Sequence, residues 1–441
     1  MKKLIAAAAV LIVAAAVLFF FFLKPPAPPP KVMVIGLDGA DWNIINPLLE
    51  QNKLPHLRSL IENGSSGVFH TVRPTKSPVL WTSIGTGKSM LKHGVLDWNY
   101  VDKNNIEIPY SVDDIQVKFA WEILGDYGHT AGVINWFCTF PATPVNGFLV
   151  SDIYTNSIDK YLECEEITYP PELYPKIYPK VIRFHDRKFK TLIDEEKVPH
   201  YLQRAQQRFD SLPDHLERQL RFFRRFFLQD KSVERTALYL MNEVPVDFFA
   251  VYLRLIDTTS HFASLFLEED LRRLWIHDNE NLGGPSPETE RKLYRNMAEI
   301  IAPVYVYMDN VVGRLKAAAP PETFFFIVSD HGFNFSTAGY NHYDTPEIAH
   351  GIIIISGPNV KPGSRLNNAS IFDLTPTLLS LYGIPLGEDM DGKVIQDAFS
   401  RRLKVKTIPS HDNGGRDPGP ERPRESDEKI LEELRTLGYI K

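Results

Sequence analysis

This chain has few cysteines and no excess of basic residues. Only two cysteines, Cys138 and Cys164, occur among 441 residues, which excludes a metal site built from several thiolates. The two either form one disulfide or remain unpaired, and the sequence leaves both alternatives open. Lys and Arg number 49 against 55 Asp and Glu, a net charge of -6, so no nucleic-acid-binding surface is expected. No internal repeat is present.

An uncharged apolar run at the amino terminus predicts a membrane anchor. Residues 4–23 form this run, and its length matches the ~20 residues of a transmembrane helix. Bulky residues and prolines follow where a signal peptide would be cleaved, so an uncleaved anchor is favoured. Lys2 and Lys3 favour a cytoplasmic amino end. We therefore assign 1–23 to a transmembrane signal anchor and 24–30 to a Pro-rich linker, with the catalytic domain on the extracytoplasmic (periplasmic or extracellular) side.

Short apolar runs predict the strands of one large domain. They are too short for typical helices and are typical of strands buried on both faces. The runs cover residues 32–37, 129–136, 248–253, 324–329 and 351–357, with apolar helices expected over 43–49 and 371–381. Strands that alternate with helices indicate a parallel sheet. The predicted fold class is α/β, a doubly wound, mostly parallel sheet sandwiched by helices over residues 31–400.

Two segments depart from this alternation. Residues 155–242 are rich in Arg, Lys, Glu and Phe, which predicts amphipathic helix and a helical insertion that caps the site. Ordinary peripheral helices are the alternative, and the Arg-Phe cluster at 219–227 is a candidate for lipid contact. Residues 401–441 are rich in Pro, Gly and charge, which predicts a flexible tail with a short terminal helix over 430–437.

Acidic and histidine residues follow three of the predicted strands. Asp38 ends the first, Asp257 and His261 follow the strand at 248–253, and Asp330-His331 end the strand at 324–329. The carboxyl ends of parallel strands meet at one edge of a sheet, where ligands bind. Carboxylate and imidazole groups gathered there suit divalent metal ions, and the pattern predicts a two-metal hydrolase.

Four motifs in this order resemble the alkaline phosphatase superfamily. They are Asp38, Pro74-Thr75-Lys76-Ser77, Asp257-Thr258-Thr259-Ser260-His261 and Ser329-Asp330-His331-Gly332. The most similar branch is the type I phosphodiesterase/nucleotide pyrophosphatase family, and the resemblance spans residues 32–393. It implies an alkaline phosphatase-like fold and a metal-dependent phosphodiesterase or phosphatase, a phosphoric ester hydrolase.

The resemblance also implies roles for individual residues. Ser77 takes the place of the nucleophile that forms a covalent phospho-enzyme, with Thr75 and Thr82 as rival hydroxyls. One metal ion would be held by Asp38, Ser77, Asp330 and His331, and the other by Asp257, His261 and His342. His350 is the rival of His342. Two Zn2+ ions are expected, with Mn2+ or Mg2+ as alternatives.

Departures from the family bear on the substrate. Trp98 stands where nucleotide-cleaving members have an Asn that binds the phosphoryl oxygen, and Pro78 replaces the aromatic residue that stacks on the base. Both weaken a nucleotide pyrophosphatase interpretation. The segment after Ser77 lacks the Cys/Ser-x-Pro-x-Arg pattern of sulfatases.

The protein is therefore expected to be a membrane-anchored, extracytoplasmic hydrolase of phosphate esters, and phosphodiesters are the first candidate substrates. The alternatives are a phosphomonoesterase, a phospho-headgroup transferase and a catalytically silent binding protein of the same fold. Three nearby residues have less direct expectations. Lys76 either assists a phosphoryl oxygen or is a solvated lysine, His93 is expected to support the nucleophile loop, and Asp373 is expected to cap its helix.

Overall fold

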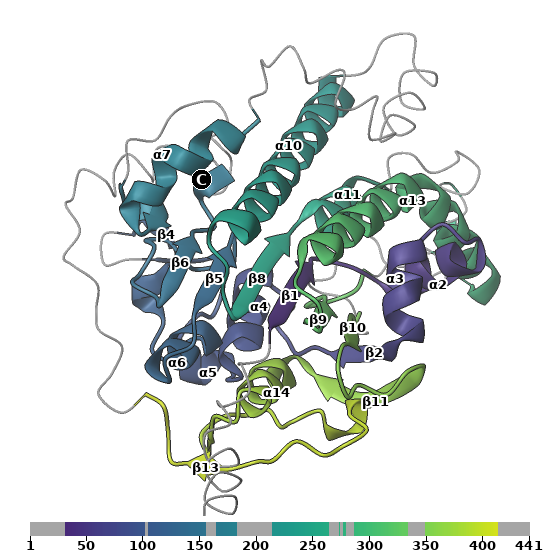
Figure 1. Cartoon of the computed structure of the whole chain (residues 1–441). Coiled ribbons are helices and arrows are strands. Elements are labelled where there is room, and N and C mark those ends of the chain that lie inside the picture. The colour runs from purple at the N-terminus through teal and green to yellow at the C-terminus, as the bar shows by residue number, and fades with distance from the viewer. Residues whose placement is uncertain are drawn as a thin grey trace, which may run out of the picture.

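A nine-stranded sheet forms the centre of the protein (Figure 1). The computed structural model describes residues 31–101, 105–155, 165–182, 214–263, 273, 277–278, 286–333 and 349–412. The strand order is β11 (Ser364–Ser370), β2 (Gly64–His70), β10 (Gly351–Ser356), β9 (Phe324–Val328), β1 (Val32–Leu37), β8 (Phe248–Leu253), β5 (Ala131–Ile134), β6 (Gly147–Val150) and β7 (Thr168–Tyr169).

The middle of the sheet is parallel. Strands β9, β1, β8, β5 and β6 run in the same direction, whereas β10 is antiparallel to both β9 and β2, and β7 is antiparallel to β6. The predicted mostly parallel α/β sheet is confirmed. The expected strand at 351–357 exists as β10, but it runs against its neighbours. Its six residues are all buried, and burial on both faces does not reveal strand direction.

Helices cover both faces of the sheet, and alternate residues of β1 point to opposite layers. Met33 and Ile35 pack with one layer, which comprises α2 (Trp42–Glu50), α3 (Pro55–Glu62), α10 (Asp214–Glu243), α11 (Leu255–Ala263) and α13 (Pro287–Ala318). Val32 and Val34 pack with the other, which comprises α4 (Ser77–Thr86), α6 (Ala120–Asp126) and α14 (Leu374–Leu381). This two-sided burial explains the uninterrupted apolar runs of the central strands.

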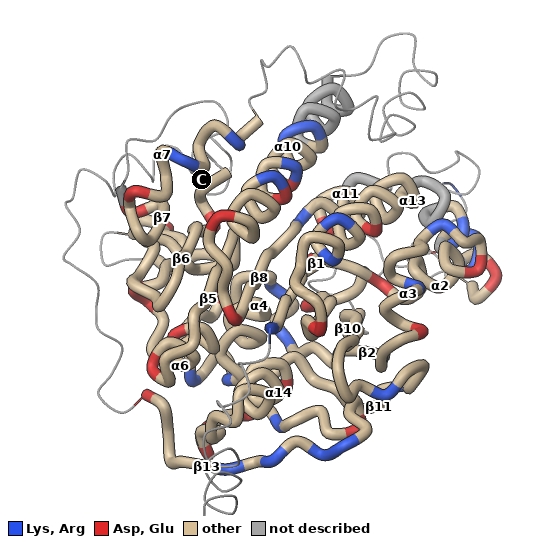
Figure 2. The backbone as a smooth tube through the Cα atoms, viewed as in Figure 1, with Lys and Arg blue, Asp and Glu red and all other residues tan. Residues whose placement is uncertain are grey.

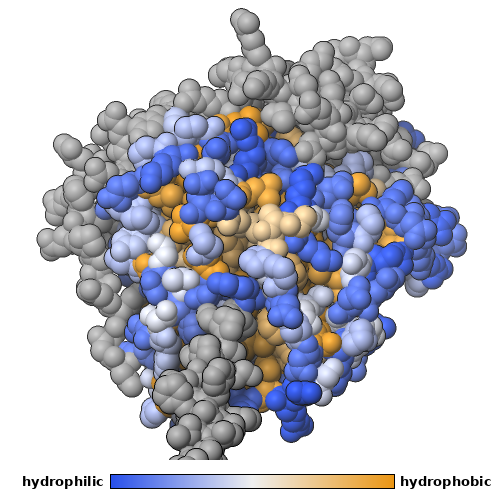
Figure 3. Space-filling view, viewed as in Figure 1, coloured by the Kyte–Doolittle hydropathy of each residue, from blue (hydrophilic) through white to orange (hydrophobic). Residues whose placement is uncertain are grey.

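The inserted segment contains both helix and strand. Its described parts include β7 at the edge of the sheet and the long helix α10. Phe223 and Phe227 of the Arg-Phe cluster belong to α10 and are buried in the hydrophobic core. These two rings therefore contact other parts of the protein. Charged residues lie along the coloured part of α10 in Figure 2. Hydrophilic side chains cover much of the described surface in the same view (Figure 3). Residues 183–213 lie outside the described part.

The beginning of the predicted tail differs from a flexible arm. β13 (Thr407–Ile408) pairs in parallel with β12 (Leu386–Gly387). The buried ammonium group of Lys88 lies 2.5 Å from Asp389 and also pairs with Asp412. These contacts join residues 401–412 to the body of the domain because a buried charge needs a partner. The remainder of the tail, 413–441, is outside the described residues.

Two further expectations fall partly or wholly on residues that the structure does not describe. The predicted anchor and linker, residues 1–30, are among these. Within the described ranges, no helix combines the length and apolarity that a membrane span requires. Cys138 is a buried free cysteine, and Cys164 lies outside the described residues.

Candidate metal centre

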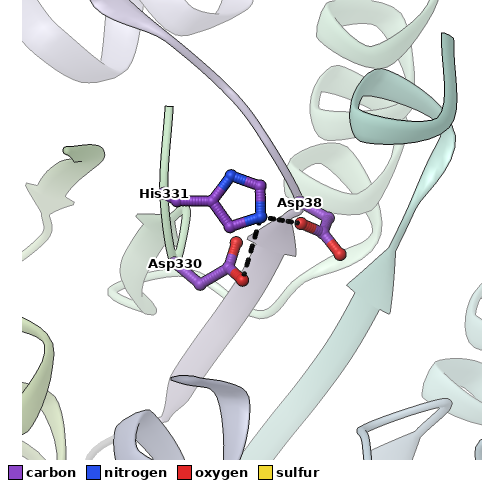
Figure 4. Close-up of side chains that lie close together, drawn as sticks. All are labelled: Asp38, Asp330 and His331. Atoms are coloured by element: carbon purple, nitrogen blue, oxygen red, sulfur yellow. Dashed lines mark ion pairs between the residues drawn. The ribbon is translucent and has the colours of Figure 1, made fainter. Parts of the chain in front are cut away.

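Three predicted ligands meet where β1 and β9 end. Asp38 follows β1 directly, and Asp330-His331 follow β9 after a single residue. Nε2 of His331 lies 3.3 Å from Oδ1 of Asp38 and 3.5 Å from Oδ2 of Asp330 (Figure 4). One ligand atom from each side chain lies within 4.8 Å of the other two. The neighbouring parallel strands thus bring together residues almost 300 positions apart in the sequence.

This cluster is buried and carries negative charge. Asp38 is 2% exposed, and Asp330 and His331 are fully buried. Among the described residues, neither carboxylate oxygen of Asp330 has a hydrogen-bond partner. Burial and the neighbouring charges of Asp38 and Asp257 raise the pKa of Asp330 well above 3.8. A buried carboxylate without a partner is unfavourable, and two carboxylates with one imidazole are a suitable donor set for a divalent cation.

A different aspartate caps the helix that follows β1. Oδ1 of Asp41 accepts a hydrogen bond from the N–H of Asn43 at 2.7 Å, which caps α2. Its Oδ2 accepts from the N–H of Phe333 at 2.9 Å, and burial raises the pKa of Asp41 to about 6. Because Asp41 supplies the cap, the Asp38 carboxylate is left to face His331. The sequence analysis did not single out Asp41, although Asp is a preferred capping residue.

Asp257 packs against the backbone that follows Asp38. Its N–H donates to the carbonyl oxygen of Asp38 at 3.0 Å. Gly39 has a φ of +70°, and a Cβ at this position would lie 2.8 Å from Cβ of Asp257, so the close approach requires glycine. One turn later on α11, Nε2 of His261 lies 3.4 Å from Oδ1 of Asp257. The four-residue spacing therefore pairs these two predicted ligands as expected.

The third predicted member of this second ligand set is not described. His342 lies outside the described residues. Its rival His350 accepts a hydrogen bond at Nδ1 from the N–H of Thr71, at 3.2 Å. The His350 ring also contacts the His70 ring edge-on, with centroids 4.7 Å apart. Nδ1 of His350 therefore already has a protein partner.

Ser77 begins helix α4. It is 2% exposed, and in the described part of the chain no side chain caps this end of the helix. One turn later, Trp81 covers Gly36 of β1, where an added Cβ would lie 2.6 Å from the indole ring. This contact holds α4 against the strand that leads to Asp38. Of the rival hydroxyls, Thr82 donates along the helix to Pro78 O at 2.7 Å, and Thr75 is 2% exposed.

His93 supports the helix that carries Ser77. The N–H of Val95 donates to His93 Nδ1 at 3.1 Å, and Nε2 lies 2.9 Å from the Ser83 hydroxyl. Burial lowers the pKa of His93 to about 4, so the ring is neutral at pH 7 and its Nε2–H donates to Ser83. The Ser83 hydroxyl in turn donates to Val79 O at 2.9 Å. This is the supporting role expected for His93.

The other two residues near these motifs have protein partners. Lys76 pairs with Asp97 at 2.5 Å. The carboxylate of Asp373 accepts from the N–H groups of Ser370 and Lys393, at 2.9 and 2.8 Å. Asp373 therefore caps the 3-10 turn at Ile371–Asp373, which directly precedes α14. The cap lies next to the helix that Asp373 was expected to cap.

A tyrosine that was not predicted from the sequence contacts the candidate metal centre. The hydroxyl of Tyr252, on β8, donates a hydrogen bond to Oδ2 of Asp38. Burial and the negative charge of Asp38 raise the pKa of Tyr252 well above 10, so the hydroxyl keeps its proton. In the sequence Tyr252 is one member of an apolar strand, and nothing there distinguishes it from a core residue.

Comparison with known proteins identifies the family. The family model for type I phosphodiesterase / nucleotide pyrophosphatase matches residues 32–349, more than half of the chain. The chain belongs to this family. Its members are phosphoric ester hydrolases, so the enzyme class predicted from the sequence is confirmed. No relative was found among the curated proteins.

Solved structures share the fold with this phosphodiesterase family member. A 2-O GAG sulfatase is 12% identical with a TM-score of 0.53, and the match covers 87% of this chain and 76% of the sulfatase. Human ectonucleotide pyrophosphatase/phosphodiesterase 5 is 14% identical with a TM-score of 0.48, and the match covers 84% of this chain and 100% of the human chain. The likeness to the sulfatase shows the alkaline phosphatase-like fold.

The type I phosphodiesterase family is metal-dependent, and the observed donor set fits a metal. Asp38, Asp330 and His331 offer two carboxylates and one imidazole. The oxygens of Asp330, which have no hydrogen-bond partner within the described part of the chain, are the particular feature that a bound cation would satisfy.

Proposed function

We propose that this protein hydrolyses phosphate esters, first of all phosphodiesters, through nucleophilic attack by Ser77 at a centre that holds two divalent cations. The observation that carries the proposal is the buried Asp38, Asp330 and His331 cluster, in which neither Asp330 oxygen has a hydrogen-bond partner. These residues would hold one cation. Asp257 and His261, 3.4 Å apart on α11, would hold the other together with His342 or His350.

The chain's own groups have distinct tasks in this reaction. Oγ of Ser77 forms a bond to phosphorus while the bond from phosphorus to the leaving-group oxygen breaks, and that oxygen departs as an alcohol after it gains a proton. Water then cleaves the phosphoseryl bond and restores Ser77. The uncapped start of α4, where Ser77 lies, offers backbone N–H groups and the positive end of the helix dipole to an anionic phosphoryl group.

The bound cations would supply the remaining electrostatic stabilisation. When bound, two divalent ions favour ionisation of the attacking hydroxyl and stabilise negative charge on the attacking and leaving oxygens. Zn2+ is our first choice because it accepts both carboxylate and imidazole ligands in sites of low coordination number. Mn2+ and Mg2+ are the alternatives.

We also propose that residues 1–23 anchor the hydrolase in a membrane, with the catalytic domain on the extracytoplasmic side. Support comes from the uncharged run at 4–23 and from Lys2 and Lys3 before it. The test is protease treatment of lysed cells and of cells in which any outer membrane has been permeabilised while the inner membrane stays intact. Cleavage of the catalytic domain without lysis supports the placement, and cleavage only after lysis contradicts it.

The test of the function itself compares two esters. The purified chain is assayed with bis-p-nitrophenyl phosphate and p-nitrophenyl phosphate, with and without a chelator, and its metal content is measured. Faster, chelator-sensitive turnover of the diester supports the proposal. Preference for the monoester identifies a phosphomonoesterase, and phosphoryl transfer to an added alcohol in place of water identifies a transferase. Bound metal without turnover of any tested ester indicates a binding protein.

A further inference from the structure

We propose that Tyr252 is a positioning residue of the metal centre. Its hydroxyl donates a hydrogen bond to Oδ2 of Asp38, so that only Oδ1 of this carboxylate faces the cation. The inference rests on the proposed function, because it requires that Asp38 binds a metal ion. It adds a residue outside the predicted ligand set and assigns different tasks to the two oxygens of one carboxylate.

The two oxygens of Asp38 have different neighbours. Tyr252 donates its hydroxyl hydrogen to Oδ2, whereas Oδ1 lies 3.3 Å from Nε2 of His331. His331 Nε2 is itself 3.5 Å from the Asp330 carboxylate. Oδ1 therefore belongs to the cluster of three ligand atoms, and the tyrosine side of the carboxylate faces away from it.

The tyrosine ring is fixed from both sides. Tyr252 is 1% exposed, and its ring contacts Trp81 and Phe137 edge-on, with centroid distances of 5.0 Å in each case. Tyr252 pairs in register with Gly36 on β1, which has no side chain and leaves room for the Trp81 ring. Its backbone oxygen accepts from the Asn135 side chain at 3.1 Å. These contacts hold the hydroxyl at one place relative to Asp38.

A carboxylate held in this way binds metal through one oxygen. The hydrogen bond from Tyr252 is charge-assisted, and an oxygen that accepts it is a weaker second ligand. One-oxygen binding suits the compact coordination of Zn2+, whereas Ca2+ commonly takes both oxygens of a carboxylate. Loss of such a supporting hydrogen bond typically weakens metal binding about 10- to 100-fold. Trp81 lies one turn after Ser77, so the same ring also joins the metal centre to the nucleophile helix.

The test is the Zn2+ affinity of the full domain in the Tyr252→Phe variant, measured by competition with a chromophoric chelator. This substitution keeps the ring and removes only the hydroxyl. The matched control is Tyr154→Phe, whose buried hydroxyl donates to Ile177 O at 2.9 Å and lies 2.9 Å from the Thr236 hydroxyl. We expect a dissociation constant about 10- to 100-fold higher for Tyr252→Phe and an unchanged value for Tyr154→Phe. In the Co2+-loaded protein, the visible absorption spectrum should change only for Tyr252→Phe.

Three results overturn the inference. The first is a folded Tyr252→Phe variant with wild-type Zn2+ affinity and Co2+ spectrum. The second is an equal loss of affinity in Tyr154→Phe, which indicates a general loss of stability. The third is a wild-type protein that binds no divalent metal, which overturns the proposed function as well.

A structure of the wild type with metal bound provides an answer if Tyr252→Phe does not fold. Coordination through Oδ1 of Asp38, with the Tyr252 hydroxyl on Oδ2, supports the inference. Coordination through both oxygens, or a tyrosine turned away from Asp38, overturns it.

Discussion

The carboxylate of Asp230 on α10 accepts hydrogen bonds from the backbone N–H groups of Arg254 and Leu255, at 3.2 and 2.8 Å. These two N–H groups stand at the start of α11. Asp230 therefore caps, from a neighbouring helix, the helix that presents Asp257 and His261. The inserted segment was expected to cover the site. In the described residues, its helix α10 also fixes the element that carries the second pair of candidate ligands.

Replacement of Asp230 by Asn should change how stability depends on pH. Burial raises the pKa of Asp230 to about 7, whereas an unfolded chain has an Asp pKa of about 3.9. Between these values the native state binds more protons, so the free energy of unfolding falls as pH rises. The contribution of Asp230 is complete below about pH 4 and is lost as pH passes about 7. The Asp230→Asn variant has no ionisable group at this position, so its free energy of unfolding should not show this decline.

Urea unfolding from pH 5 to 7 measures the effect. The free energy of unfolding should decline more steeply in the wild type, by up to about 1.4 kcal/mol per pH unit. The companion variant is Asp309→Asn. Asp309 caps α3 through the N–H groups of His56 and Leu57, and burial raises its pKa as well, so this variant should change the slope in the same direction although Asp309 belongs to neither ligand pair. Parallel slopes for wild type and Asp230→Asn contradict the assignment.

Removal of the Ser77 hydroxyl should abolish turnover. Ser77→Ala is expected to lose at least about a thousandfold in kcat for bis-p-nitrophenyl phosphate, as loss of a covalent nucleophile does, while Tm and the Asp330 metal site are retained. Thr75→Ala and Thr82→Ala are the matched controls, because each removes a rival hydroxyl. Full activity in Ser77→Ala, or its loss in one of the controls alone, assigns the nucleophile elsewhere.

Asp330→Asn should have opposite effects with and without metal. In the metal-free protein the buried Asp330 carboxylate faces the charge of Asp38 and has no hydrogen-bond partner, so the neutral amide should raise the free energy of unfolding. With Zn2+ present, the variant should lose the stabilisation that ligand binding gives the wild type. Thermal unfolding with EDTA and with Zn2+ checks both signs at pH 7. Equal Zn2+ stabilisation of both proteins contradicts a metal at Asp330.

Metal content should separate the two ligand sets. Asp257→Ala is expected to lower the bound metal from about two ions per chain to about one, because Asp38, Asp330 and His331 remain. The same loss in His342→Ala, with no loss in His350→Ala, would make His342 the third ligand. The reverse result would select His350. Unchanged metal content in Asp257→Ala contradicts a second site on α11.

Much of the site follows from periodicity and residue order. Apolar runs too short for helices located β1, β8 and β9, and the polar residues after them located Asp38, Asp257 and Asp330. The spacing of Asp257 and His261 fitted a helix, and α11 supplies it. These features are local, and the parallel sheet then brings the strand ends together.

Features that depend on contacts between distant segments were not predicted. β10 is antiparallel to β9, whereas its sequence indicates only that the strand is buried. Tyr252 and Asp230 each act on a partner in another element, and their own neighbours in the sequence contain no trace of that partner. Asp41 differs, because its cap on Asn43 is local and only its contact with Phe333 joins distant segments. For the same reason the sequence predicted a flexible tail that includes residues 401–412, although Lys88 pairs with Asp412 across the domain.

The central claim is that Asp38, Asp330 and His331 hold a cation beside the Ser77 hydroxyl. A crystal structure with Zn2+ and orthovanadate, with anomalous data at the zinc edge, tests it most directly. We expect an anomalous peak within coordination distance of Asp38 Oδ1, Asp330 and His331 Nε2, and vanadium bonded to Oγ of Ser77. Zinc bound elsewhere, or vanadate held away from Ser77, would contradict it.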